Sequence, residues 1–416
     1  MIRKTIAALA ALAAAVPASA GNLMLGPVKF HPNYKFETRY EDNIYRVPRD
    51  QNGYAVAGGG VRGSWIFSNA LGLGVEAPVT EHSKLSLDYL FTAENYTKQS
   101  KANDAYNQNA SASWDFKGSK TKAQAYDRYV NTQDPAFNPN GNVVNGALVQ
   151  RERRWQNEAG ANGEYYLGDK FFAGADFSNT QDRYLDRSGG SNSLANLLDR
   201  STDRFGVKAG YQVMPKTRVF VAEHRKLVHY TEHTRLDNHR DWDTDFGVEG
   251  QMTGKLKGLV QTGFVYQKYD YDPANAGRKL DGRHWSYLAR LAYQATRNTK
   301  AVLTGARNAN DSSASNSQYY IATGVNLALD HKFTEKISAG VNGGVEYDKY
   351  SDDFTVGTVT KSRRDDNYTA GAHADYQALD WLSVGASFLH NSRFSSFSRE
   401  YSYRDNITGV NLKAMF

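Results

Sequence analysis

Four of the ten histidines in this chain of 416 residues lie within one short stretch, and histidine with carboxylate is a ligand set suited to Zn, Ni or Cu. Their spacings of five, four and six residues match no standard ligand pattern, and a polar surface loop is the simpler interpretation. The sequence therefore predicts no metal site and leaves these residues as candidates only: His224, His229, His233 and His239, accompanied by Glu223, Glu232 and Asp237.

Hydrolysis is a second chemistry that the histidines could serve. A lipase or protease needs a nucleophile or base with a histidine in hydrogen-bond reach. His373, and His390 near Ser387, are the possible partners, but no motif connects them. The chain has no cysteine, which excludes disulfides, thiolate metal sites and thiol nucleophiles. We therefore expect a protein without catalytic residues and without a cofactor, with an outer-membrane lipase-like or protease-like enzyme as the least favoured alternative.

The first twenty residues have the three parts of a secretory signal peptide. A basic start at Arg3 and Lys4 precedes an apolar stretch over residues 6–16, and Ala18-Ser19-Ala20 follows as a cleavage signal. We predict cleavage near Ala20 and export from a bacterial cytoplasm, with residues 21–416 forming one domain. Removing Arg3 and Lys4 lowers the formal net charge from +6 to +4, and the remaining charges are interspersed, which argues against a nucleic-acid partner.

A repeated unit organises the chain from about Tyr34 onward. Two alternating segments are joined by a very short turn and followed by a longer polar loop. Eight short turns lie between 79–84 and 378–381, and nine long loops lie between 47–53 and 391–399. This layout predicts an all-β, antiparallel, up-and-down transmembrane barrel of about eighteen strands, with sixteen as the alternative. Both ends of the barrel chain are then expected in the periplasm of a Gram-negative bacterium.

Most of these segments have one apolar face and one polar face. Phe205, Val207 and Ala209 alternate with Arg204 and Lys208, for example. The mean hydropathy is only −0.64, but in a transmembrane barrel only every second residue meets lipid. The segment 217–230 does not sort into two such faces.

The C-terminal segment shows the same alternation up to its last residue, with Phe416, Ala414 and Leu412 on one face. An unpaired backbone group in lipid costs several kcal/mol, so a sheet in the membrane must close on itself. We therefore expect the last strand to pair with the first. A terminal aromatic resembles the assembly signal of outer-membrane proteins, which makes Phe416 the expected contact with the barrel-assembly machinery. Outer-membrane lipid is the other expected partner.

The predicted strand number is large enough for an aqueous channel. Charges of both signs fall on the polar faces, which suits neutral or zwitterionic solutes such as sugars better than ions of one charge. Tyr166 and Tyr320 could stack on sugar rings, although all these side chains could simply hydrate the wall. The candidate pore-lining residues are Glu158, Glu164, Tyr166, Asp176, Arg204, Lys208, Asp245, Glu249, Arg290, Glu346 and Asp375.

One short stretch carries a family resemblance. Tyr40-Glu41-Asp42-Asn43-Ile44-Tyr45-Arg46 resembles the opening motif of the β-barrel porins encoded in exopolysaccharide gene clusters. The resemblance implies an outer-membrane channel for export or handling of a polysaccharide or oligosaccharide, and it implies no catalytic residues. The polysaccharide and a periplasmic export partner are then possible partners. A general or sugar-selective diffusion porin is the alternative. The loops at 131–149 and 183–202 are long enough to fold inward and narrow such a pore.

Overall fold

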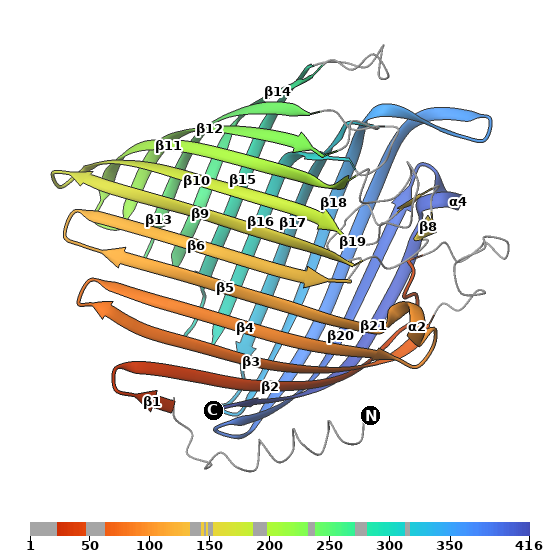
Figure 1. The fold of residues 1–416 in the computed structure, drawn as a ribbon, viewed down its shortest axis with the longest axis horizontal. Coiled ribbons are helices and arrows are strands. Elements are labelled where there is room, and N and C mark those ends of the chain that lie inside the picture. The colour runs from red at the N-terminus through yellow and green to blue at the C-terminus, as the bar shows by residue number, and fades with distance from the viewer. Residues whose placement is uncertain are drawn as a thin grey trace.

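Eighteen long antiparallel strands close into one barrel in the part of the chain that the structure describes (Figure 1). The structure is a computed structural model and describes residues 23–46, 63–133, 143–144, 147–148, 153–185, 198–231, 238–270, 281–312 and 317–416. The predicted signal peptide lies outside the described residues. The first barrel strand pairs with both the second and the last, so the prediction of a closed barrel of eighteen strands is confirmed.

The barrel strands are mostly thirteen to fifteen residues long, enough to cross a membrane at a tilt. They are β2 (Val28–Glu41), β3 (Ser64–Thr80), β4 (Ser83–Tyr96), β5 (Ala105–Lys117), β6 (Thr121–Thr132), β9 (Arg154–Leu167), β10 (Phe171–Tyr184), β11 (Arg200–Met214), β12 (Thr217–Tyr230), β13 (His239–Gln251), β14 (Leu256–Tyr269), β15 (Asp281–Gln294), β16 (Thr299–Asp311), β17 (Tyr319–Lys332), β18 (Ile337–Val356), β19 (Val359–Leu379), β20 (Leu382–Ser395) and β21 (Tyr403–Met415).

Five further elements are short. β1 (Leu23–Leu25) folds back on the start of β2, and β7 (Val143–Val144) pairs with β8 (Ala147–Leu148). The single-turn helices α2 (Ser100–Asn103) and α4 (Ser398–Tyr401) lie in connections between barrel strands. None of the described helices is long and apolar enough to cross a membrane.

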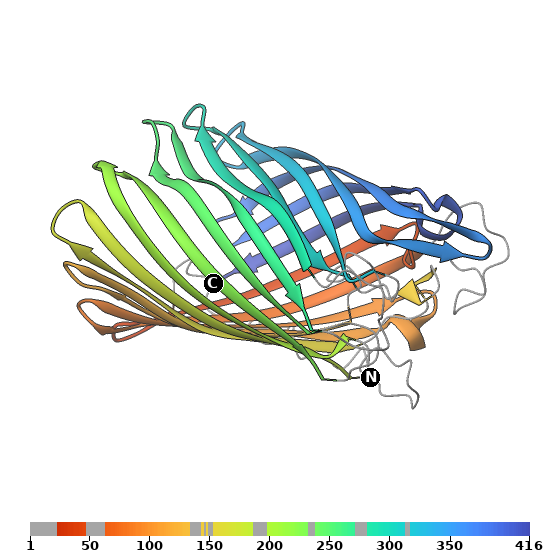
Figure 2. The ribbon, with the colours of Figure 1, turned by 90° about the horizontal axis from the view of Figure 1, so that it is seen from above.

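The two ends of the barrel differ in their connections (Figure 2). Eight connections of two to four residues lie at one end, which we call the turn end. The longer connections lie at the other, the loop end. β2 begins and β21 ends at the turn end, as the predicted alternation of turns and loops requires.

One of the nine long loops predicted from the sequence, at residues 349–364, is instead part of two strands, so that prediction was wrong. β18 and β19 continue through this region as a hairpin that extends beyond the neighbouring strands, and it turns at Gly357 with a φ of 61°. The sequence 354–360 is rich in β-branched residues, which favour extended backbone, and Phe354 is buried in an aromatic cluster. The polar residues before it suggested a loop, but they fall at a register irregularity between Lys349 and Asp353.

Contacts between strands that are not neighbours identify the inward face. Arg200 of β11 reaches Asp311 of β16, and Arg218 of β12 reaches Glu164 of β9, so these side chains must cross the interior. The alternate positions carry exposed apolar side chains, such as Val207 at 60 % exposure. The barrel therefore has a polar interior and an apolar outer surface, as lipid on one side and water on the other require.

Phe416 is held at the turn end on both sides of the closing seam. Its N–H donates to the carbonyl of Pro32 in β2 at 3.0 Å, and its ring stacks on Trp381 from the β19–β20 turn with centroids 5.7 Å apart. The last residue thus contributes to the closure of the barrel.

Candidate functional site

The strand register places all eleven candidate pore-lining residues on the inward face. Glu164 and Lys208 both lie opposite Gly174, for instance, on the two strands that flank β10. Residues directly opposite each other on neighbouring strands share a face. Following these pairs from strand to strand around the barrel places Glu346 of β18 and Asp375 of β19 on the inward face as well. That these residues line the path of a solute stays a prediction.

A compact group of charged side chains crosses the interior near the turn end. Arg218 donates two hydrogen bonds of 2.8 Å to the carboxylate of Glu164, and its Nε lies 2.6 Å from Glu249. Lys208 bonds the same oxygen of Glu249. We call these four residues the turn-end charge network. Two cations and two carboxylates make it neutral as a whole.

Aromatic rings support this network from the wall. The guanidinium of Arg218 lies 4.3 Å from the ring centre of Phe172, and the ammonium of Lys208 lies 4.1 Å from that of Phe220. A Cβ on Gly210 would lie 2.4 Å from the Phe172 ring, so glycine leaves the space that the ring fills. Tyr166 completes the group, because its hydroxyl accepts from Arg218 at 3.1 Å. The interior here offers stacked cations, carboxylates and a phenol, all groups that exchange hydrogen bonds with sugar hydroxyls.

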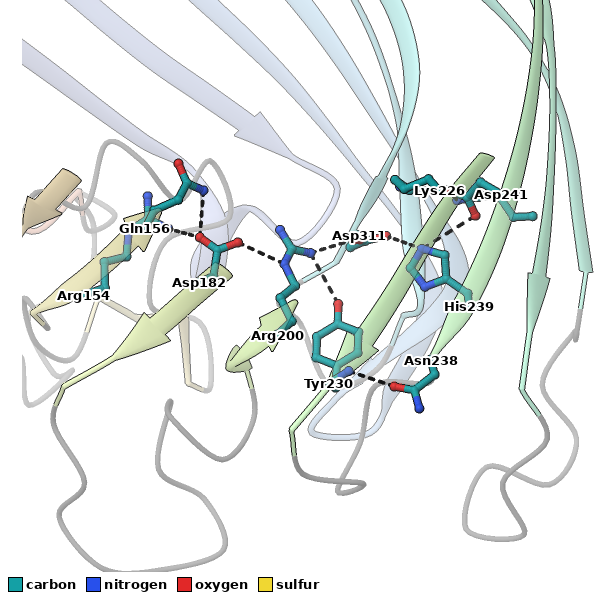
Figure 3. A network of polar contacts seen from close by, with 11 residues as sticks. Arg154, Gln156, Asp182, Arg200, Lys226, Tyr230, Asn238, His239, Asp241 and Asp311 are labelled. Atoms are coloured by element: carbon teal, nitrogen blue, oxygen red, sulfur yellow. Dashed lines mark hydrogen bonds and ion pairs between the residues drawn. The ribbon is translucent and has the colours of Figure 1, made fainter. Parts of the chain in front are cut away.

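A second polar network crosses the interior at the loop end (Figure 3). Arg200 donates to Asp311 at 2.6 Å and to Asp182 at 3.2 Å, and its Nη1 lies 3.5 Å from the hydroxyl of Tyr230. Asp182 also accepts from Gln156 at 2.7 Å. Five barrel strands are tied together by these five side chains.

The same network continues along β12 and β13. Lys226 lies 2.7 Å from Asp241, and His239 lies 3.1 Å from Asp311. His239 and Asp241 are both about 2 % exposed, so the charges of this region are compensated inside the protein rather than by solvent. The network thus links β11, β12, β13 and β16 across the interior at the loop end.

Between the two networks, Arg290 and Glu346 border a hollow of about 420 Å³ on the inward face of β15 to β19. The remaining candidates have local partners. Tyr126 donates to Glu158 at 2.9 Å, and Lys413 lies 3.6 Å from Asp375. Asp245 is buried and lies opposite Ala222 of β12. Two more candidates lie on the inward face in the middle of the barrel. Asp176 lies 3.5 Å from His224, and Arg204 lies opposite Lys226.

The structure does not bring together the three candidate histidines that it describes. His224 and His229 are five residues apart on β12 and therefore point to opposite faces. His239 lies in the loop-end network, and His233 falls outside the described residues. In the described part of the chain, no group of three histidine or carboxylate side chains is arranged to hold a metal ion.

Only one of the two candidate histidines for a hydrolytic site shares a face with Ser387. His390 contacts Asn406 of β21 at 2.7 Å and lies opposite Ala370, whereas Ser387 lies on the other face, opposite His373. Odd spacing along one strand sends the two side chains to opposite sides of the wall.

Tyr320 cannot serve as a sugar platform in the position that the structure gives it. It is 3 % exposed and stacks on Tyr350 at 5.3 Å, within an aromatic cluster at the loop end. Arg363 lies in the same cluster, with its guanidinium 3.6 Å from the ring centre of Tyr401. Burial raises the pKa of the Tyr401 hydroxyl, and the nearby Arg363 charge opposes that shift.

Sequence reasoning missed several residues that organise the interior: Asp182, Arg200, Arg218, Lys226, Asp311 and Arg363. Arg218 and Lys226 lie on β12, whose two faces the sequence pattern does not separate. Arg200 lies at a strand end inside the predicted loop 183–202, and Asp182 directly precedes that loop. Asp311 lies at a strand end inside another of the nine predicted loops, 308–318. Extending the alternation by two residues at these ends would have placed Asp182 and Arg200 inward.

The stretch that carries the family resemblance closes the loop end of the seam between the first and last strands. Ile44 and Tyr45 are almost fully buried and pack against Ile66 and Tyr96. The side-chain amide of Asn43 donates to the carbonyl of Arg404 in β21 at 2.9 Å. The motif is therefore a structural element that folds over the closure of the barrel.

The fold and the interior define the class: a transmembrane β-barrel with a charged, hydrogen-bonding lumen. The chain matches the protein family described as "Putative beta-barrel porin 2" over residues 19–416, and it belongs to that family. A search of the curated proteins finds no match.

Several solved outer-membrane barrels are similar in fold. OccAB4 of Acinetobacter baumannii is 10 % identical and aligns over 95 % of this chain and all of that one, with a TM-score of 0.49. OccAB3 of the same organism is 12 % identical over 93 % and 99 %, with a TM-score of 0.47. The siderophore receptor PirA of that organism is 10 % identical over 93 % and 80 %, with a TM-score of 0.45. At this level of similarity the structures carry no argument about function.

Proposed function

We propose that this β-barrel porin is an outer-membrane channel that exports or handles a neutral or zwitterionic polysaccharide or oligosaccharide. In this proposal the turn end faces the periplasm, where an export partner would dock, and the polysaccharide crosses the lumen. Mature protein would begin near Gly21, and Phe416 would be read by the barrel-assembly machinery. The family membership supports a barrel in the outer membrane, and the chemistry of the lumen supports the solute class.

The balanced charge of the interior is the observation that carries the proposal. Lumen charges of a single sign would attract ions of the opposite sign. Here Arg218 and Lys208 are matched by Glu164 and Glu249, so the turn-end charge network presents donors and acceptors with little net field. A polyhydroxylated chain can exchange hydrogen bonds with both kinds of group as it moves.

An aromatic ring beside these charges suits the same solute. Tyr166 is partly exposed at the wall, whereas Phe172, against which it packs with ring centres 6.2 Å apart, is buried behind it. The C–H face of a sugar ring stacks on such surfaces while its hydroxyls meet the neighbouring charges.

Diffusion of small solutes is the second candidate function. The hollow beside Arg290 and Glu346 favours it, because open space in the middle of the lumen would allow unassisted passage. This candidate differs from the first in its electrical behaviour, which one experiment can measure.

Conductance of the full mature protein in planar bilayers distinguishes the two. For the export channel, we expect a small single-channel conductance that falls when a neutral oligosaccharide of several rings is added. The reversal potential in a KCl gradient should stay close to zero. A large, stable conductance that the oligosaccharide leaves unchanged would replace the first proposal with the second. Strong selectivity for cations or anions would contradict the assignment of a neutral solute.

A further inference from the structure

A row of four side chains crosses the outer surface of the barrel near the loop end, one on each of four adjacent strands. Arg225 of β12 lies opposite Trp242 of β13, Trp242 lies opposite Tyr266 of β14, and Tyr266 lies opposite Arg283 of β15. The rings of Trp242 and Tyr266 are stacked at 5.6 Å. The guanidinium of Arg225 lies 5.5 Å from the Trp242 ring, and that of Arg283 lies 5.4 Å from the Tyr266 ring. We call these four residues the arginine–aromatic row.

The strand register shows that the row faces away from the lumen. Lys226, next to Arg225, points inward to Asp241, so Arg225 points outward. Toward the turn end, the same face of β12 and β13 carries Val221 opposite Phe246, both exposed and apolar. The row therefore lies at the loop-end margin of the apolar band that would face lipid.

Further basic side chains surround the row on the same face. In the next line toward the loop end, Arg240 lies opposite Lys268. On the turn-end side, the guanidinium of Arg307 lies 4.7 Å from the ring of Trp285. Glu223, the nearest carboxylate on β12, accepts a hydrogen bond from the hydroxyl of Thr244. Nearby acids at the loop-end margin are Asp270, which pairs with Arg240 at 3.2 Å, and Asp281, opposite Lys268.

Arg225 and Arg283 are exposed, and neither makes an ion pair within the described part of the chain. The aromatic rings hold the planes of their guanidinium groups while the N–H edges remain available. Such edges match the oxygens of a phosphate group, which arginine binds through two parallel hydrogen bonds. Cationic side chains are costly on the lipid face and are tolerated close to the interface, where lipid phosphates lie.

We propose that the arginine–aromatic row binds the phosphate group of an anionic membrane lipid in the leaflet at the loop end. Arg225 and Arg283 bind phosphate oxygens, Trp242 and Tyr266 keep the two guanidinium groups in place and contact the lipid at the interface, and Arg307 adds to the local positive charge. This site also accounts for β12, whose outward face carries Glu223 and Arg225 where an apolar strand would carry aliphatic residues.

The barrel contains a matched control on the other side of its wall. Arg404 of β21 lies on the outward face, is exposed, and has its guanidinium 5.6 Å from the ring centre of Phe394. The Phe394 ring also contacts Tyr368 with ring centres 5.8 Å apart, but among the described residues no second arginine stacks on these two rings. Its substitution removes the same charge and the same kind of contact from a place outside the row.

The test uses the full mature protein refolded in detergent and measures bound lipid by native mass spectrometry. The probes are bisphosphorylated lipid A, the same lipid with its phosphates removed, and inorganic phosphate alone. We expect the wild-type protein and Arg404→Gln to retain the phosphorylated lipid at least fivefold more than the dephosphorylated one. The Arg225→Gln/Arg283→Gln variant should retain both lipids equally. Inorganic phosphate alone should not bind measurably.

Four results would overturn the proposal. The first two are equal retention of phosphorylated lipid by the wild-type protein and the double glutamine variant, and equal retention of both lipids by the wild-type protein. The third is binding of inorganic phosphate without lipid. The fourth is a dimer or trimer that only the double variant loses, which would make the row an interface between copies. Folding is checked by the heat-dependent gel shift of a closed barrel. Should the glutamine variant fail to fold, Arg225→Lys/Arg283→Lys keeps the charge but loses the paired hydrogen bonds. A loss of at least twofold is then expected, and no loss overturns the site.

Discussion

Asp42 and Asn406 join the two ends of the barrel chain at the loop end of the closing seam. One carboxylate oxygen of Asp42 accepts from the backbone N–H of Asn406 at 2.8 Å, and the other accepts from its side-chain amide at 2.7 Å. The N–H of Asp42 in turn donates to the carbonyl of Asn406 at 3.1 Å. Although 364 residues separate them in sequence, the two residues are bound at three points.

Removing this link should weaken the barrel. Hydrogen bonds to a charged group contribute about 1.5–3 kcal/mol each, and their loss leaves two donors of Asn406 without their acceptor. We expect Asp42→Ala to lower the free energy of unfolding by about 3 kcal/mol, measured as a shift of the urea midpoint in detergent. Asp380→Ala, in the exposed β19–β20 turn, is the control and should leave the midpoint unchanged. Coincident midpoints for both variants would show that the seam does not depend on Asp42.

Arg218 should set the charge balance of the lumen at the turn end. Replacing it with glutamine leaves Glu164 and Glu249 with Lys208 as the remaining cation of the turn-end charge network. We expect Arg218→Gln to move the reversal potential in a KCl gradient toward cation selectivity. The Arg218→Gln/Glu164→Gln variant restores the balance and should return the potential close to the wild-type value. A single variant that keeps the wild-type potential would place these charges outside the ion path.

Arg363 should hold the extended β18–β19 hairpin in its observed position. Its guanidinium donates to the Asp365 carboxylate through Nε at 3.0 Å and is enclosed by the rings of Tyr350, Phe354 and Tyr401. Breaking a buried pair by removing one partner costs about 3–5 kcal/mol. We expect Arg363→Ala to accelerate amide hydrogen exchange over residues 349–364 by more than tenfold. The neighbouring exposed Arg364→Ala serves as the control, and equal exchange in the two variants would contradict this role.

Phe416 should matter more for assembly than for the stability of the finished barrel. Its stacking on Trp381 is of the kind that contributes about 0.5–1.5 kcal/mol. We expect Phe416→Ala and Trp381→Ala to lower the stability of the refolded protein by similar small amounts, with little further loss in the double variant. In cells, Phe416→Ala alone should sharply reduce the amount of folded barrel. Equal cellular amounts for the two single variants would argue against an assembly signal at Phe416.

Much of the fold could be predicted because alternation is a local property of each strand. A residue and its second neighbour share a face, so one apolar row identifies both the strand and its inward side chains. This is why Lys208, Glu249 and Glu346 could be assigned to the inward face without a structure. The even number of strands and the regular placement of short turns then defined the barrel. Strand ends were less certain, since the polar residues of an extended hairpin such as 349–356 resemble those of a loop.

The sequence by itself determined that this chain is a barrel of alternating strands and which side chains share a face. Only the tertiary structure decided which of those side chains meet. Arg200 and Asp311 are 111 residues apart on strands that are not neighbours, and the curvature and stagger of the closed sheet bring them within 2.6 Å. The arginine–aromatic row arises in the same way, because Arg225, Trp242, Tyr266 and Arg283 become adjacent only through the register of four strands. The face to which a side chain points is encoded within its own strand. The side chains that it contacts depend on how all the strands close into the barrel.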